Sequence, residues 1–183
     1  MNGKRIGRRT VALRTPPSVL SFANIGGRME GHGPLAKYFD ELCEDSFFGE
    51  KTWEKAESAM QERVLRRALE QAGLAPDELD YVLAGDLLNQ CIGSSFGLRD
   101  FSIPFFGLYG ACSTMGESLA LAAMLIDGGF AEKAAAQASS HFCTAERQYR
   151  MPVPYGSQRT PTAQWTATAA GCTLLSAQGP GPY

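Results

Sequence analysis

The sequence feature that most constrains the fold is the stretch around Cys112, where a strand pattern changes directly into a helix pattern. The apolar run 103–108 is typical of a buried strand, and glycines interrupt it. The next apolar residues recur at a helical spacing, at Met115, Leu119, Ala122 and Ile126. A double glycine at 128–129 then ends the segment. The pattern predicts a strand, a tight corner that holds Cys112, and a helix.

This predicted helix is apolar on all sides and rich in small residues, which is typical of a buried helix. We therefore expect it to lie centrally in the fold, with Cys112 at its N-terminus. Unpaired backbone N–H groups and the positive end of the helix dipole converge there and favour a reactive thiolate. A small buried cysteine at a tight turn explains the same pattern, because free cysteine is often part of a core. Both interpretations remain open.

Helix and strand patterns alternate along the rest of the chain. The clearest helix begins after Thr52 and stops at Gly73. The other predicted elements are strands over 81–85, 133–140 and 165–176, short helices over 35–42 and 94–98, a long loop over 142–164, and a loop-rich N-terminal segment up to Pro34 with one short strand near 11–13. This alternation indicates an α/β fold, with a mostly parallel sheet covered by helices.

Composition is that of an ordinary soluble globular domain. The 183 residues are 44% hydrophobic and 20% charged, and a net charge of −2 gives no reason to expect nucleic acid as a partner. Five cysteines without a CxxC pair argue for synthesis in a reducing compartment and against a disulfide framework or a zinc site. We find no signal-peptide pattern and no apolar stretch near the ~20 residues of a membrane span.

The segment after residue 140 combines arginines with aromatic residues. Its members are Arg147, Tyr149, Arg150, Tyr155, Arg159 and Trp165. Guanidinium groups bind carboxylates through paired hydrogen bonds, and aromatic faces stack on flat rings, so the set suits a small planar anion. From composition alone, a solvated loop whose arginines pair with surface acids is the simpler interpretation.

Two further polar residues, Asp86 and His141, each follow a predicted strand. The ends of parallel strands gather at one edge of an open sheet, so we expect both side chains to lie beside Cys112. Structural roles are the alternatives: Asp86 bonds its own loop, and His141 caps its strand or bonds a backbone carbonyl. Neither His141 nor His32 belongs to a recognisable catalytic pattern.

Motifs along nearly the whole chain resemble one known family. They are FAN at 22–24, EGHGPL at 30–35, GEKTWEKAE at 49–57, AGDLLNQ at 84–90, GACST at 110–114, SSHFCTAERQ at 139–148 and PTAQWT at 161–166. The GACST corner by itself resembles the nucleophile elbow of thiolases and ketoacyl synthases. The whole set, in this order, resembles the stage V sporulation protein AD family of the thiolase-like superfamily.

This resemblance implies a thiolase-like layered fold with two similar halves, of which residues 1–183 look like the N-terminal half. We therefore expect a fragment, with surface exposed that the second half normally covers. In acyl-transferring relatives the histidines that activate the cysteine come mainly from that second half.

The resemblance also implies a function in bacterial endospore formation. The family binds dipicolinic acid (pyridine-2,6-dicarboxylate), which moves into the spore as its calcium chelate. We predict a non-catalytic binding protein without a cofactor, which binds dipicolinate either alone or as its calcium chelate. The predicted site residues are Cys112, Asp86, His141, Arg147, Arg159 and Trp165.

Other subunits of a spore membrane channel assembly are the expected partners. We expect synthesis in the cytoplasm without a signal peptide, and a position peripheral to the inner spore membrane. Two other functions remain open. One is a thiolase or ketoacyl-synthase-type acyltransferase with Cys112 as its nucleophile. The other is an interaction subunit whose surface matters more than its pocket.

Overall fold

The computed structural model describes residues 4–149, 161–162, 164–179 and 181. Its centre is a six-stranded sheet in the order β4-β3-β8-β7-β5-β6. The strands are β3 (Ser18–Gly27), β4 (Glu41–Cys43), β5 (Tyr81–Gly85), β6 (Phe105–Gly107), β7 (Lys133–Ser140) and β8 (Ala169–Ser176). Five strands run in one direction, and β8 alone runs antiparallel to its neighbours β3 and β7. The prediction of an α/β fold with a mostly parallel sheet is confirmed.

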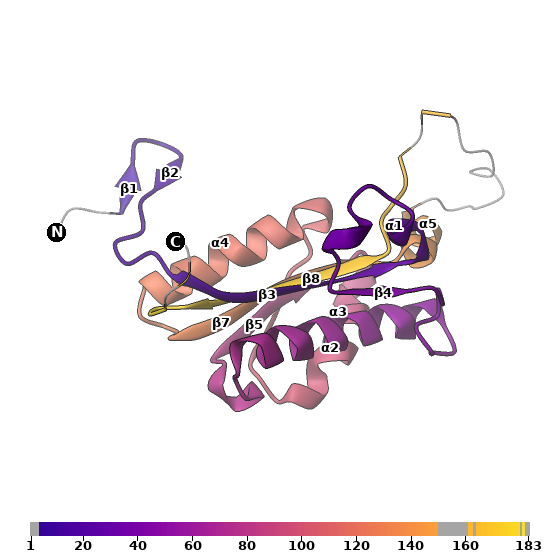
Figure 1. The fold of residues 1–183 in the computed structure, drawn as a ribbon. Helices are drawn as coiled ribbons and strands as arrows, with labels where there is room; N and C mark the ends of the chain where they lie inside the picture. The colour runs from indigo at the N-terminus through magenta and orange to yellow at the C-terminus, as the bar shows by residue number, and fades with distance from the viewer. Residues whose placement is uncertain (1–3, 150–160, 163, 180, 182–183) are drawn as a thin grey trace.

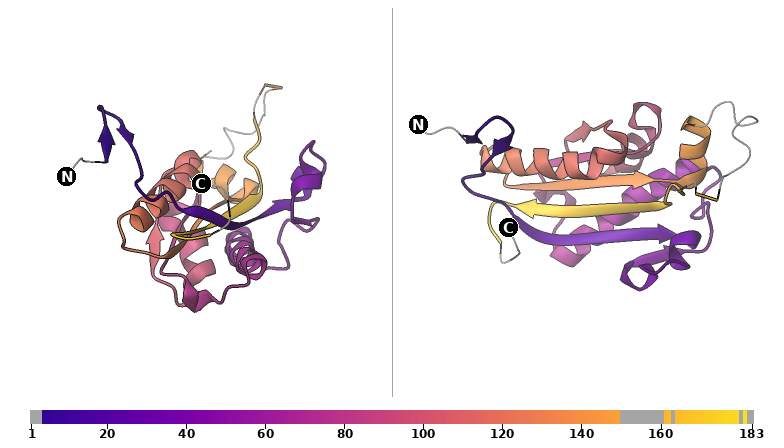
Figure 2. Two further views of the ribbon diagram at one scale, coloured as in Figure 1. Left: turned by 60° about the vertical axis from the view of Figure 1, so that its left-hand side comes forward. Right: turned by 90° about the horizontal axis from the view of Figure 1, so that it is seen from above.

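Helices cover both faces of this sheet and give three layers (Figure 1). α2 (Trp53–Ala72) and α3 (Ile92–Leu98) lie on one face, and α4 (Thr114–Asp127) lies on the other. The short helices α1 (Arg28–Gly31) and α5 (Phe142–Tyr149) follow β3 and β7 directly. A hairpin of β1 (Arg5–Ile6) and β2 (Thr10–Val11) lies apart from the sheet near the N-terminus (Figure 2).

The helix α2 confirms its prediction at both ends. The Thr52 hydroxyl accepts a hydrogen bond from the Lys55 N–H at 3.3 Å and caps the N-terminus. Gly73 ends the helix in the left-handed conformation, with a φ of 66°, which glycine adopts at little cost. The apolar stripe that packs on the sheet consists of Ala56, Met60, Val64, Leu65, Ala68 and Leu69. This burial stabilises a helix whose outer positions are mostly charged.

The helix α4 differs from its prediction on its outer face. Its buried stripe is made of Thr114, Ser118, Ala122 and Ile126. On the opposite side Leu121 and Met124 are 38% and 46% exposed. The expectation of a helix buried on all sides is therefore wrong for this chain, because within the described residues no element lies over that outer side (Figure 1).

The N-terminal segment contains β3, a ten-residue strand in the middle of the sheet, where the sequence predicted a loop-rich segment. Polar and small residues hide the strand pattern, because they are buried here with hydrogen-bond partners. Ser21 Oγ donates to the Ala68 carbonyl at 2.7 Å, and Ser18 Oγ donates to the Gly179 carbonyl at 3.0 Å. A buried serine is tolerated in a strand when its hydroxyl makes such a hydrogen bond, because a buried hydroxyl without a partner would destabilise the fold.

Tertiary pairing also overrides the prediction for residues 35–42. Only a 3₁₀ turn over Ala36–Tyr38 forms there, and Glu41–Cys43 pairs with β3 as the edge strand β4. The predicted short helix over 94–98 is present as α3, which begins two residues earlier.

The second half of the chain needs three corrections. The loop predicted from 142 begins with the helix α5, and β8 starts at Ala169 instead of 165. The strand predicted over 103–108 is the short edge strand β6, and its residues are exposed because it pairs on one side only, with β5.

Candidate functional site

The strand-to-helix corner predicted at Cys112 is present. After β6 a 3₁₀ turn over Ala111–Ser113 leads directly into α4. Ala111 has a φ of 49°, a left-handed conformation that costs a residue with a Cβ atom roughly 1–2 kcal/mol. The tight corner leaves Cys112 exposed at the start of the helix.

Gly85, at the end of β5, allows this corner to approach the sheet closely. A Cβ atom at Gly85 would lie 2.0 Å from the Leu108 carbonyl oxygen and 2.8 Å from Thr114 Cγ2. Only glycine leaves room for this approach. The Leu108 N–H also donates to the Ala84 carbonyl at 2.8 Å, so the end of β5 fixes the position of the corner.

Beside Cys112 lies a hollow of about 650 Å³. Its floor consists of small and polar residues of β3, β7 and β8: Asn24, Ala138, Ser140, Ala169 and Gly171. Ala138 and Ser140 point to the same side of β7 as Ala136, and Ala169 and Gly171 point to the same side of β8 as Leu175. Ala136 and Leu175 pack towards α4, so the hollow is on the α4 face of the sheet. Cys112 and Met115 line it from the α4 side, and residues 164–167 also line it.

Trp165 lines the same hollow as Cys112. Its ring packs on Phe142, the first residue of α5, with ring centroids 4.8 Å apart. About half of the side chain's surface remains exposed. Of the predicted site residues that the structure describes, Cys112 and Trp165 line the same hollow.

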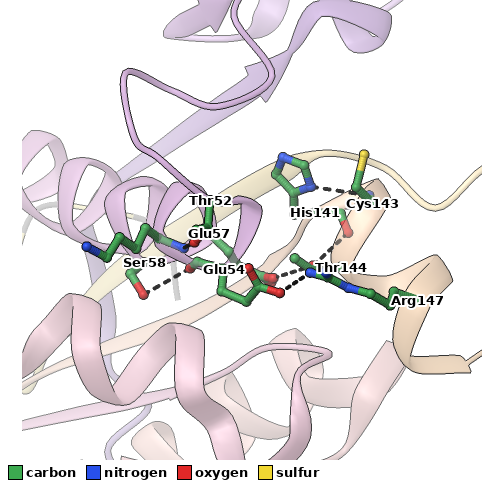
Figure 3. A network of polar contacts seen from close by, with 9 residues as sticks. Thr52, Glu54, Glu57, Ser58, His141, Cys143, Thr144 and Arg147 are labelled. Atoms are coloured by element: carbon green, nitrogen blue, oxygen red, sulfur yellow. Dashed lines mark hydrogen bonds and ion pairs between the residues drawn. The ribbon is translucent and has the colours of Figure 1, made fainter.

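His141 ends β7 as expected, but both of its ring nitrogens are occupied. Nε2 lies 2.7 Å from the Ser46 carbonyl oxygen and donates to it, and Nδ1 accepts from the Cys143 N–H at 3.2 Å (Figure 3). Burial lowers the pKa of the imidazole and keeps it neutral. His141 lines a separate cavity of about 150 Å³ that shares Trp165 with the hollow. Its role is the structural alternative, a bond to a backbone carbonyl.

Asp86 lies beneath the corner and does not line the hollow. Its side chain is buried and accepts hydrogen bonds from the Leu88 N–H at 2.8 Å, the Ser94 N–H at 2.7 Å and Ser94 Oγ at 2.6 Å. These bonds hold the loop after β5 and cap the first turn of α3. The loop-bonding alternative therefore describes Asp86.

The predicted arginines do not line the hollow within the described part of the chain. Arg147 pairs with Glu54 at the start of α2 (Figure 3). Its guanidinium lies 5.4 Å from the centre of the Trp53 ring. Arg159 lies outside the described residues, as do Arg150 and Tyr155.

A buried polar network between α2 and the sheet was not predicted from the sequence. Glu57 and Gln61 of α2 and Gln137 of β7 have no exposed surface. Gln61 Nε2 donates to Ser139 Oγ at 2.8 Å, and Gln137 Nε2 donates to the Gln61 carbonyl at 2.8 Å. Burial first, and then the nearby Asp86 carboxylate, raise the pKa of Glu57 to about 7.

One signal in the sequence points to this network. Glu57 and Gln61 are four residues apart on α2, beside Ala56 and Met60, so the helical period places both on the buried stripe. Within the described residues no group of three or more His, Cys, Asp and Glu side chains is arranged to hold a metal ion. No helix there has the length and apolar character that crossing a membrane requires.

Comparison with known proteins identifies the family. The model of stage V sporulation protein AD (SpoVAD) matches residues 7–183. A relative from Bacillus subtilis (strain 168), stage V sporulation protein AD, is 42% identical over 178 residues. The chain belongs to the stage V sporulation protein AD family. The match covers 97% of this chain and 52% of the relative, so the chain spans about half the relative's length.

Solved structures with the same fold include two ketosynthases. The 3-oxoacyl-[acyl-carrier-protein] synthase III of Aquifex aeolicus VF5 matches with a TM-score of 0.58 at 16% identity, over 87% of this chain and 53% of its own. The priming β-ketosynthase of the R1128 polyketide pathway matches with a TM-score of 0.57 at 19% identity. This match covers 93% of the present chain and 52% of the ketosynthase. At these identities the likeness shows the fold alone, and it confirms the thiolase-like layered architecture.

Proposed function

We propose that this protein is a non-catalytic binding protein of endospore formation, which takes dipicolinic acid into the hollow beside Cys112 for uptake into the spore. Membership of the SpoVAD family supplies the setting, sporulation. The observation that carries the proposal is the hollow itself. Its volume of about 650 Å³ is in the range of small-molecule sites, and an exposed indole lines it.

The ligand's chemistry suits what lines this hollow. A pyridine ring stacks on an aromatic face, which Trp165 offers. Each carboxylate needs a fixed donor, and charge-assisted hydrogen bonds contribute roughly 1.5–3 kcal/mol. The Gln164 amide, which also lines the hollow, has two N–H donors. Arg159 remains our first choice of cation, because its segment joins α5 to Gln164 in the sequence.

The proposal of binding without turnover is supported by the residues around Cys112 within residues 1–183. A cysteine nucleophile needs a base to take its proton. Neither histidine of the chain lines the hollow, and His141 has both ring nitrogens occupied. Within residues 1–183, therefore, no histidine is placed to activate Cys112.

Calorimetric titration of the full-length natural protein with dipicolinate tests the proposal, with and without calcium, and with benzoate as the mono-carboxylate comparison. Arg159→Ala is expected to weaken binding by about one to two powers of ten, and Arg159→Lys to restore it in part. Arg147→Ala is the matched control, because Arg147 pairs with Glu54 away from the hollow. Equal weak affinity for dipicolinate and benzoate would remove dipicolinate as the ligand.

A second candidate function rests on the exposed thiol at the strained corner. Acyl transfer through Cys112 predicts thiolytic or condensing activity with acyl thioesters that Cys112→Ala abolishes. That result would replace the binding proposal. Association with other subunits of a spore membrane channel, peripheral to the inner membrane, belongs to the binding proposal and is tested by co-purification from sporulating cells.

A further inference from the structure

Glu57 is a carboxyl group without contact with solvent, and it joins three elements. Its side chain extends from α2, where the residue has no exposed surface. Ser139 Oγ of β7 donates to Oε1 at 3.0 Å, and Thr144 Oγ1 of α5 lies 2.8 Å from Oε2 (Figure 3). A buried carboxyl group with two partners on two other elements ties those elements together.

The bonding pattern of Thr144 indicates where a proton lies. Thr144 Oγ1 is 3.0 Å from the His141 carbonyl oxygen, which can only accept, and 2.8 Å from Glu57 Oε2. A hydroxyl has one proton to donate. If Thr144 donates to the carbonyl, its oxygen can accept from a protonated Glu57, and all three groups are satisfied. An ionised Glu57 draws the Thr144 proton away from the carbonyl.

The surroundings of Glu57 disfavour a second negative charge. A Cβ atom built on Gly93 of α3 would lie 3.1 Å from Glu57 Cγ and 3.2 Å from Asp86 Oδ2, so the side chains of Glu57 and Asp86 border one small space. Asp86, after β5, accepts three hydrogen bonds, from the Leu88 N–H and from the N–H and hydroxyl of Ser94. Two charged groups act on Glu57: Asp86, and Glu54 of its own helix. β7 and α5 add the hydroxyls of Ser139 and Thr144, and α3 adds the uncharged Gly93.

The same contacts lead to the wall of the hollow. Thr144 is in the first turn of α5, and Phe142, which opens α5, packs on Trp165. Trp165 and Ser139 both line the hollow. The hydrogen bond between Glu57 and Thr144 is therefore connected to the hollow through α5, Phe142 and Trp165, although Glu57 itself does not line the hollow.

We propose that Glu57 is a positioning residue: as a neutral carboxyl it donates a hydrogen bond to Thr144 and holds α5, with Phe142 and Trp165, as one wall of the hollow. Loss of its proton loosens this wall. The ligand part of this inference rests on the proposed function, whereas the wall itself can be followed without a ligand.

Acrylamide quenching of Trp165 fluorescence measures how firmly the wall is held. Trp53→Phe in the full-length natural protein leaves Trp165 as the tryptophan of residues 1–183, and any tryptophan beyond them is replaced as well. Between pH 6.5 and 8.5 the quenching constant is expected to rise about twofold as Glu57 loses its proton. His141 does not contribute in this range, because burial lowers its pKa below the ordinary 6.5.

Two variants of the Trp53→Phe protein test whether Glu57 and Thr144 cause this pH dependence. Glu57→Gln keeps a neutral donor towards Thr144 and is expected to give low quenching that does not vary with pH. Thr144→Val keeps the side-chain shape and is expected to give high quenching at every pH. Circular dichroism confirms that each variant is folded. The same pH-dependent rise in Glu57→Gln, or unchanged quenching in Thr144→Val, would overturn the proposal.

Titration with dipicolinate at pH 6.5 and 8.5 separates this inference from the proposed function. A carboxylic diacid is ionised at both values, so its own charge stays constant. Affinity that falls several-fold at pH 8.5 in the protein with Glu57, and stays constant with Gln, supports both proposals. Quenching as expected, without dipicolinate binding at either pH, supports the wall and refutes the ligand.

Discussion

Glu57 also makes the stability of the fold depend on pH. Its pKa is about 7 in the folded chain, against an ordinary value of 4.5. Between these values the unfolded chain loses a proton that the folded chain keeps. The contribution of Glu57 to the free energy of unfolding is therefore fully present below about pH 4.5. It falls as the pH rises from 4.5 to 7, and it stays constant at higher pH.

Glu57→Gln is expected to remove this slope. The amide is neutral at all pH values and can donate to Thr144, so the variant should be more stable than the parent at pH 8, by on the order of 3 kcal/mol at most. Urea unfolding of both proteins at pH 5, 6, 7 and 8 measures the difference. Glu70→Gln, on the exposed side of the same helix, is the control. A Gln variant that is less stable than the parent at pH 8, or that keeps the slope between pH 5 and 7, would contradict a raised pKa for Glu57.

The five cysteines are expected to differ in their reaction with iodoacetamide. Cys112 is exposed, whereas burial raises the pKa of Cys91, Cys143 and Cys172 and disfavours their thiolates. At pH 7.5 Cys112 should be modified at least about tenfold faster than these three. Peptide mass spectrometry over a time course gives the rates. Early labelling of Cys172 would mean that the sheet opens under native conditions.

At the scale of single residues the sequence located the corner but not the partners. Asp86, His141 and Arg147 were expected at the site because of their chemistry and their positions after strands. Each is satisfied elsewhere, by Ser94, by the Ser46 carbonyl and by Glu54. Those partners are between 8 and 95 residues away in the chain, and no local pattern encodes such pairs.

Among the elements, the N-terminal hairpin depends on one carboxylate at the end of α4. Asp127 accepts from the Arg14 N–H at 2.8 Å and the Thr15 N–H at 2.7 Å, and Lys4 Nζ pairs with it. Lys4 first, and then these backbone bonds, lower the pKa of Asp127 to about 2. The attachment is therefore present above an ordinary carboxyl pKa of 3.8 and is lost as the pH falls towards 2.

Asp127→Asn is expected to loosen the hairpin without unfolding the sheet. The amide loses the charge that attracts Lys4 and one of its two acceptor oxygens. Hydrogen exchange of residues 4–15 should become faster at pH 7, and exchange in β7 should stay the same. Glu132→Gln, nearby and exposed, is the comparison. Unchanged exchange in residues 4–15 would show that other contacts hold the hairpin.

The elements that were predicted correctly have local signals. α2 has a capping threonine, a period of 3.6 and a terminal glycine, and all three act within its own length. β3 has none of these, because its two buried serines bond to carbonyl groups of α2 and Gly179, and its half-buried Asn24 bonds to Asp40. Strands of this kind are specified by the sheet around them, which a single sequence does not display.

At the scale of the whole molecule, the two faces of the sheet are covered unequally. α2 and α3 cover one face, while α4 covers part of the other (Figure 1). The hollow lies beside α4. Phe22 of β3, with Leu121 and Met124 of α4, remains exposed. The predicted second half would cover such a surface, and this stays a prediction.

In the 183-residue chain, replacing both Leu121 and Met124 by Gln is expected to cost less than about 1 kcal/mol, because both are substantially exposed. Ala122→Gln on the buried stripe is the contrast and should cost several kcal/mol, since it forces a polar group into the core. Urea unfolding compares the three. A large loss in the double variant would show that this face is covered in solution, by a second copy for example, and sedimentation would reveal it.

The position of β8 has a consequence for synthesis on the ribosome. β4-β3 and β7-β5-β6 are two separate parts of the sheet, and β8 is the strand that joins them, with Ser18 pairing to Ser176. At roughly 5–20 residues per second, β3 leaves the ribosome on the order of ten seconds before its partner exists. Until then the edges of β3 and β7 are both unpaired. A nascent chain stalled before Ala169 thus carries two open strand edges, and it is at this stage that a chaperone has most to protect.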